Sequence, residues 1–167
     1  MSAARDLFSL RLLPAAINGL INGTLAWMVH GTTASIGLWT EGAYGIDLLV
    51  TGFLLPSISW LIVRQLLRKQ AAEGKRHDVA TLPSPWLRHI MPTALLGGAL
   101  VIGAAGTVLG AVAVLALQTL GGPSFSGSAY VAFKYAYSAL LAGLLHPTLM
   151  YAAVQSLARP SVRTKRP

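Results

Sequence analysis

The chain of 167 residues contains no cysteine, and this absence excludes two kinds of site at once. Without thiols there is neither a disulfide framework nor a thiolate metal site, and cysteine usage gives no information about the redox compartment. The sequence also lacks an H-E-x-x-H pattern, which is a common arrangement of metal-ligating histidines. We therefore expect no bound metal.

Charge is scarce as well, and acidic charge most of all. Only 11% of the residues are charged, and 5 residues are Asp or Glu, whereas roughly a quarter of an ordinary soluble domain is charged. No segment holds paired carboxylates, and neither a glycine-rich phosphate loop nor a G-x-S-x-G nucleophile pattern occurs. The sequence predicts a protein that is not an enzyme.

Hydrophobic residues make up 54% of the chain. They are concentrated in four stretches, each of which reaches the ~18 residues that make a spanning helix plausible. The stretches cover about residues 12–29, 46–63, 90–117 and 130–157. The sequence therefore predicts an all-α, polytopic membrane protein with four transmembrane helices, forming a single membrane domain over residues 1–167.

The formal net charge of +8 indicates nucleic acid binding only if the basic residues form a patch on a soluble surface. Instead, 12 of the 13 Lys and Arg residues precede the first stretch, lie between the second and third, or follow the fourth. The positive-inside rule then predicts a bacterial inner-membrane protein with both termini in the cytoplasm. Anionic lipid headgroups are the expected partners of the basic segments, and no nucleic acid partner is expected.

A cleaved secretory signal peptide is an alternative interpretation of the first stretch. Arg5 and Arg11 fit a positively charged n-region, and the small residues of "TTAS" fit a cleavage site. Cleavage would leave three helices and an unexplained charge pattern, so four spans are favoured.

The second and fourth stretches are similar to each other at an offset of 91 residues. Both contain G-x-x-x-P, as Gly52 and Pro56 in one and Gly143 and Pro147 in the other. The first stretch matches the third less closely, at an offset of 78. We therefore predict two tandem helix hairpins of the same orientation, since each crosses the membrane twice. The predicted segments are hairpin one at about 12–68, a basic cytoplasmic loop at about 64–89, hairpin two at about 90–159 and a basic tail at 160–167.

Each shared proline is expected to kink its helix, because its ring removes one N–H and pushes against the carbonyl of residue i−4, here a glycine. The carbonyls of Gly52 and Gly143 then need water, a side chain or a ligand, since unpaired polar groups in hydrocarbon are costly. Prolines that are simply tolerated in membrane helices are the plainer alternative.

Small residues form faces on two of the expected helices. Gly103, Gly106 and Gly110 lie on the third stretch, and Gly19 and Gly23 form a G-x-x-x-G pair on the first. Such faces let helices approach closely in lipid. Packing within the bundle is favoured over a dimer interface.

Asn18, Asn22, Asp47 and Lys134 are candidate functional residues in or beside the apolar stretches. The two asparagines share a helix face because they stand four residues apart, and interhelical hydrogen bonds are the plain expectation for their amides. A polar track for a solute is the alternative. For Asp47 and Lys134 we predict an ion pair on the periplasmic side, with a lysine that snorkels to the headgroups as the alternative.

His146 is the one histidine near the middle of an apolar stretch, opposite Leu55 in the repeat. A haem held by two histidines needs a second imidazole at the same depth, and none is evident, so no cofactor is expected. One residue is weak support for a pigment ligand or a proton relay. A neutral histidine hydrogen-bonded to Asn18 or Asn22 is the plainer expectation.

The stretch "LINGTLAW…IGLWTEGAYGIDLLVTGFLLPSISWLIV", within residues 20–63, resembles small four-helix bacterial inner-membrane proteins with no assigned activity. The resemblance covers the first hairpin only and implies no functional residues.

Two classes of function remain open. The first, which we favour, is an accessory subunit that packs against other membrane subunits, or against itself, through its glycine-rich and aromatic faces. The second is a small transporter or channel-like component. It would be homo-oligomeric, because four helices enclose little volume, and the polar residues would line its path.

Overall fold

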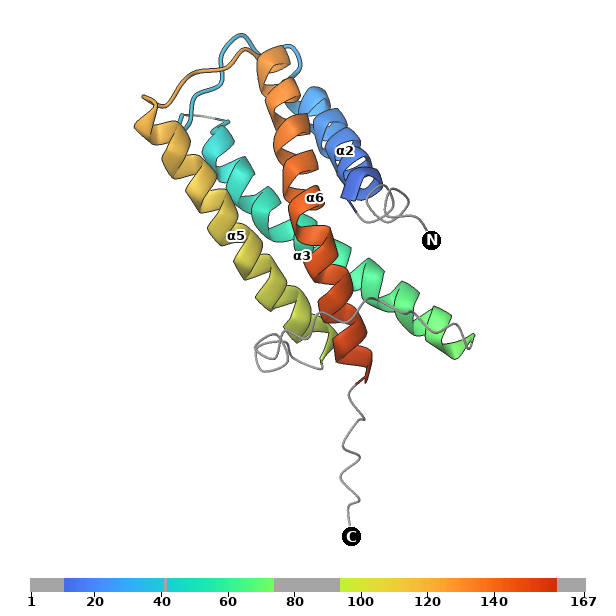
Figure 1. Cartoon of the computed structure of the whole chain (residues 1–167). Coiled ribbons are helices and arrows are strands. Elements are labelled where there is room, and N and C mark those ends of the chain that lie inside the picture. Colours follow the sequence, from blue (N-terminus) through green and yellow to red (C-terminus); the bar gives the residue numbers. More distant parts are fainter. Residues whose placement is uncertain (1–10, 41, 74–93, 159–167) are drawn as a thin grey trace.

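A computed structural model of the chain describes residues 11–40, 42–73 and 94–158, which form four helices (Figure 1). Each helix overlaps one of the four predicted apolar stretches, so the all-α class is confirmed. The helices are α2 (Leu13–His30), α3 (Tyr44–Ala72), α5 (Leu95–Thr119) and α6 (Gly127–Ala158).

Three of these helices are long and apolar enough to cross a membrane, namely α3, α5 and the Gly127–Val154 part of α6. Helix α2 is not among them, although we predicted a span there. Its 18 residues just reach the length that makes a spanning helix plausible. Two asparagines and His30 instead lower its mean hydropathy. The described residues therefore contain three candidate spans instead of the four predicted.

The helices do not pack in the order in which the chain connects them. Helix α2 packs along α6, α3 packs along α5, and α3 also contacts α6, so that α3 and α6 form the centre of the bundle (Figure 1). Contacts between α2 and α3, and between α5 and α6, are marginal among the described residues. The two helices of each predicted hairpin are therefore splayed apart, and each packs on a helix of the other half.

Glycines bring α5 into backbone contact with α3. A Cβ atom on Gly106 would meet the carbonyl oxygen of Gly52, and one on Gly110 would lie 3.1 Å from the carbonyl oxygen of Leu48. Gly103 faces the same helix, where it contacts Ser57. The prediction that this small-residue face packs within the bundle is confirmed.

Gly19 and Gly23 bring α2 close to α6 in the same way. A Cβ atom on Gly19 would lie 3.0 Å from the carbonyl oxygen of Tyr135 and 3.1 Å from Cβ of Ala139. One on Gly23 would lie 3.2 Å from the Tyr135 side chain. Both predicted glycine faces are thus occupied by helices of the chain itself.

The two helix pairs correspond to each other when the halves of the chain are exchanged. Contacts between α2 and α6 have counterparts between α5 and α3. A counterpart is found by adding 91 to the number of the α2 residue and subtracting 91 from that of the α6 residue. Two examples are Gly19–Ala139 with Leu48–Gly110, and Ala15–Gly143 with Gly52–Gly106. The contacts therefore favour an offset of 91 for α2 on α5, in place of the 78 inferred from the sequence.

The loops that precede α3 and α6 are joined to each other. Ile36 and Phe125 exchange two antiparallel backbone hydrogen bonds of 2.8 and 3.0 Å. The hydroxyl of Tyr44 donates to the carbonyl oxygen of Pro123 at 2.7 Å. These contacts fix the starts of α3 and α6, and Asp47 and Lys134 lie within the first turn or two of these helices.

Several predicted features lie outside the described residues. They include Arg5, most of the basic loop at 64–89 and the tail at 160–167. The orientation that depends on them stays a prediction.

Candidate functional site

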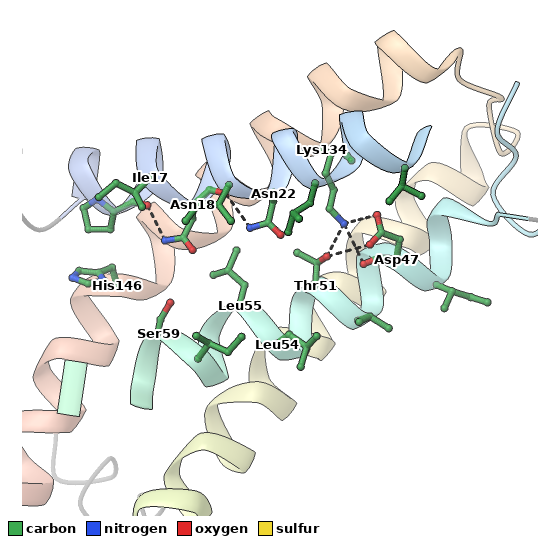
Figure 2. Close-up of a pocket in the computed structure, with 18 of the residues that line it drawn as sticks. Ile17, Asn18, Asn22, Asp47, Thr51, Leu54, Leu55, Ser59, Lys134 and His146 are labelled. Atoms are coloured by element: carbon green, nitrogen blue, oxygen red, sulfur yellow. Dashed lines mark hydrogen bonds and ion pairs between the residues drawn. The ribbon is translucent and has the colours of Figure 1, made fainter. Parts of the chain in front are cut away.

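A groove of about 1020 Å³ lies between α2 and α3, and side chains of α6 also line it (Figure 2). It exists because α2 and α3 each pack on other helices and make only marginal contact with one another. We call it the α2–α3 groove. Its walls are mainly aliphatic side chains, including the exposed residues Ile17, Ile21, Leu25, Ile46, Leu54 and Ile58.

The structure brings all five polar candidates of the sequence to this one groove. Two further polar residues of α3, Thr51 and Ser59, join them, and the sequence had not singled these out. The five candidates are Asn18 and Asn22 on α2, Asp47 on α3, and Lys134 and His146 on α6.

Lys134 and Asp47 form the ion pair that was predicted, with Nζ 2.6 Å from Oδ2. The ammonium also donates to the hydroxyl of Thr51 at 2.6 Å and to the backbone carbonyl of Asp47 at 3.3 Å. All three donors of the lysine are thus satisfied. Its side chain is only 3% exposed, so the alternative of a snorkelling lysine does not hold. A charge buried this deeply needs both a counter-charge and hydrogen bonds.

Asp47 is the more accessible member of the pair. Oδ2 accepts a hydrogen bond from Tyr130 as well as from Lys134, and Thr51 donates to Oδ1 at 3.5 Å. Asp47 lies in the first turn of α3, where the positive end of the helix dipole stabilises a carboxylate. Its side chain is 37% exposed, so one edge of the carboxylate remains open to the groove (Figure 2).

Asn18 and Asn22 donate along their own helix and make none of the predicted interhelical hydrogen bonds to described residues. Asn18 Nδ2 donates to the carbonyl oxygen of Pro14 at 2.9 Å, and Asn22 Nδ2 donates to that of Asn18 at 3.0 Å. The reason is the groove itself, which keeps α3 too far from α2 to supply a partner. Each amide therefore has its oxygen and one N–H left to face the groove (Figure 2).

His146 lies at the end of the groove away from the ion pair (Figure 2). It makes no hydrogen bond to Asn18 or Asn22 in the described part of the chain, contrary to the plainer expectation. The second histidine that lines the groove, His30, stacks edge-on against Tyr130 at 5.4 Å between ring centroids. His30 therefore belongs to the ion-pair end, and the two imidazoles do not face each other.

The polar residues form a stripe along the groove. Ser59 lies twelve positions after Asp47 on α3, and His146 lies twelve positions after Lys134 on α6. At 1.5 Å per residue, either span covers about 18 Å, which is more than half of the ~30 Å hydrocarbon core. The stripe therefore offers hydrogen-bond partners over a length that is comparable with the depth of a bilayer leaflet.

The corresponding positions in the other half of the chain are almost all apolar. With the offset of 91, the polar residues of α2 and α3 correspond to residues of α5 and α6, and those of α6 to residues of α3. Asn18, Asn22, Thr51, Ser59, Lys134 and His146 match Leu109, Ala113, Ala142, Met150, Ala43 and Leu55. Because the two halves pack alike, packing alone does not require the polar stripe.

The G-x-x-x-P motifs do not contribute to the groove lining. Pro56 and Pro147 lie inside α3 and α6, and both helices continue through them. The Gly52 carbonyl faces the backbone of Gly106, and Gly143 faces α2. The motifs therefore position helices, and the sequence alternative in which the glycine carbonyls bind a ligand gains no support from the groove.

Comparisons with known proteins add no identity. No family model, curated protein or solved structure matches the chain. The resemblance of the first hairpin to small inner-membrane proteins therefore stays a prediction. Fold and site together define an all-helical protein with three candidate membrane spans and a polar-striped groove between two helices.

Proposed function

We propose that the protein is a polytopic protein of the bacterial inner membrane that binds an amphiphilic molecule of the bilayer in the α2–α3 groove. In this role it is a small transporter component for that molecule. One observation carries the proposal: five polar residues from three helices converge on a groove with aliphatic walls. An amphiphile suits this arrangement, because its tail covers the walls while its head group pairs with the stripe.

We also propose that α2 crosses the membrane with the other three helices. Its contacts with α6 correspond to those of α5 with α3, and α5 is a candidate span. The asparagines of α2 face the groove and not the lipid, which lowers the cost of placing them in the bilayer. Four spans in two tandem hairpins put both termini on one side, and the basic segments favour the cytoplasm for that side.

The groove is expected to fill sideways from the bilayer. Its aliphatic edges are exposed on both α2 and α3, with Ile21 at 52% and Ile58 at 51%. Such edges are stable in contact with lipid tails and would be poor walls for a water-filled channel. A lipid can therefore enter without first passing through water.

An accessory subunit of a larger complex is the second candidate. The exposed aromatic residues Trp27 and Trp39, at 64% and 54%, favour it, although aromatic belts at a membrane surface have the same composition. The glycine faces are no longer available for this role, because Gly19, Gly23, Gly106 and Gly110 are covered within the bundle. This is why we favour the groove.

Photocrosslinking tests the proposal. The full chain, reconstituted in nanodiscs, is irradiated with a lipid that carries a diazirine in its acyl chain, and labelled residues are mapped by mass spectrometry. We expect labels to concentrate on the groove-lining faces of α2 and α3. Ile58→Trp, which fills the groove, should reduce that labelling several-fold.

Leu115→Trp is the matched control, because Leu115 is an exposed aliphatic residue of α5 that does not line the groove. It should leave the labelling of α2 and α3 unchanged. Labels spread evenly over every exposed helix face would contradict the proposal.

A further inference from the structure

The polar stripe of the α2–α3 groove offers a ligand no uncompensated charge. Its one lysine, Lys134, has its three donors on Asp47 and Thr51. Asp47 is in turn neutralised by Lys134, and no arginine is among the described residues that line the groove. A phosphate head group would therefore enter a low-dielectric site without a free cation to meet it, which is costly.

Apart from the open edge of the Asp47 carboxylate, whose charge Lys134 neutralises, the groups that remain free are neutral donors and acceptors in mixture. Asn18 and Asn22 each keep an amide oxygen and one N–H after their bonds along α2. His146 makes no hydrogen bond to a described residue, and a neutral imidazole has one donor and one acceptor. A hydroxyl group, which donates and accepts at once, complements such a mixture better than a pure acceptor does.

On these grounds we infer that the groove selects lipids whose head group is uncharged and bears several hydroxyls, such as a sugar, over lipids with a phosphate head group. The inference rests on the proposed function and specifies its ligand class. A free sugar is not the ligand, because aliphatic side chains make up most of the lining. A sugar without an acyl chain would leave these apolar walls uncovered.

Competition between two lipids with identical acyl chains tests this selectivity. The full chain, delipidated in mild detergent, is mixed with equal amounts of a glucosyl diacylglycerol and a phosphatidylglycerol, and bound lipid is counted by native mass spectrometry. We expect the sugar lipid to be bound at least about tenfold more, the effect of about one or two net hydrogen bonds. Ile58→Trp should abolish binding of the sugar lipid.

Two variants connect the preference to the stripe. Asn18→Leu with Asn22→Ala replaces each amide by a residue of the type found at the corresponding position, Leu109 or Ala113, and should remove the preference. Asn18→Arg adds a cation and should shift the preference toward phosphatidylglycerol, which keeps the inference testable if the double variant does not fold. Leu109→Asn with Ala113→Asn is the matched control and should leave the preference unchanged.

The failures are distinguishable. Equal or greater binding of phosphatidylglycerol by the unaltered chain, reduced by Ile58→Trp, would overturn the selectivity and leave the proposed function standing. Lipid binding that is insensitive to Ile58→Trp would overturn both. Displacement of the lipid by free glucose, or a lipid-free dimer as the stable species, would overturn the lipid as occupant of the groove.

Discussion

Lys134 places a positive charge where its side chain is 3% exposed, and the whole ion-pair end of the groove is organised around it. The spacing of residues along the helices was enough to predict its pairing with Asp47. It was not enough to predict that Thr51 would bind Lys134 or that Tyr130 would bind Asp47. Nothing in the spacing of these two residues distinguishes them from other polar residues near helix ends. Nor did it predict that the asparagines bond along α2, since that depends on the separation of α2 from α3.

The two members of the ion pair should differ in the cost of their removal. Asp47→Asn leaves a buried ammonium without its counter-charge and should destabilise the fold by about 3–5 kcal/mol. Lys134→Met leaves a carboxylate that is 37% exposed and can be hydrated, so it should cost less. Thermal unfolding in detergent measures both.

The exchange of charges, Asp47→Lys with Lys134→Asp, should recover part of the stability that either residue's replacement loses. Recovery would be incomplete, because a lysine in the first turn of α3 opposes the helix dipole. A swap that is no more stable than Asp47→Asn would contradict the importance of the pair.

At the scale of helices, the lengths of the apolar stretches and the positions of glycine predicted much of the fold. All four helices were found, and both glycine faces pack within the bundle. The sequence did not predict which helices pack against each other. Splayed hairpins could not be read from the sequence, because the glycine faces of α2 and α5 fit equally well, on their residue types, against either central helix. The asparagines that line the groove lower the mean hydropathy of α2, which is not among the candidate spans.

Gly106, which contacts the motif glycine Gly52, and Gly143, a motif glycine itself, should respond differently to replacement by alanine. In Gly106→Ala the new methyl group meets the backbone carbonyl of Gly52, which cannot move aside, so we expect a loss of about 1–3 kcal/mol. In Gly143→Ala the methyl group lies 3.5 Å from Cβ of Ala15, an ordinary contact. That variant should be neutral or stabilised by up to about 1 kcal/mol through helix propensity.

Thermal midpoints of the two purified alanine variants, measured in the same detergent, make the comparison. Equal destabilisation by both would count against the packing described for α3 on α5 and α2 on α6.

At the scale of the whole molecule, two halves with corresponding packing differ in the chemistry of one groove. The sequence predicted the repeat through its shared glycine and proline, and it singled out His146 as the member without a polar counterpart. It could not show that Asn18 and Asn22 share the same asymmetry, because the correspondence of α2 with α5 follows from contacts and not from residue identity. The polar stripe is therefore a property of the assembled bundle.

The central claim is that the polar residues of the α2–α3 groove serve binding and are not needed for packing. The most direct test is the triple variant Asn18→Leu, Asn22→Ala and His146→Leu, which gives the groove the residues of the other half at these positions. Its thermal midpoint and the lipid that co-purifies with it are measured beside those of the unaltered chain. We expect a midpoint that is unchanged or higher, together with loss of the bound lipid. A lower midpoint with the lipid retained would contradict the claim.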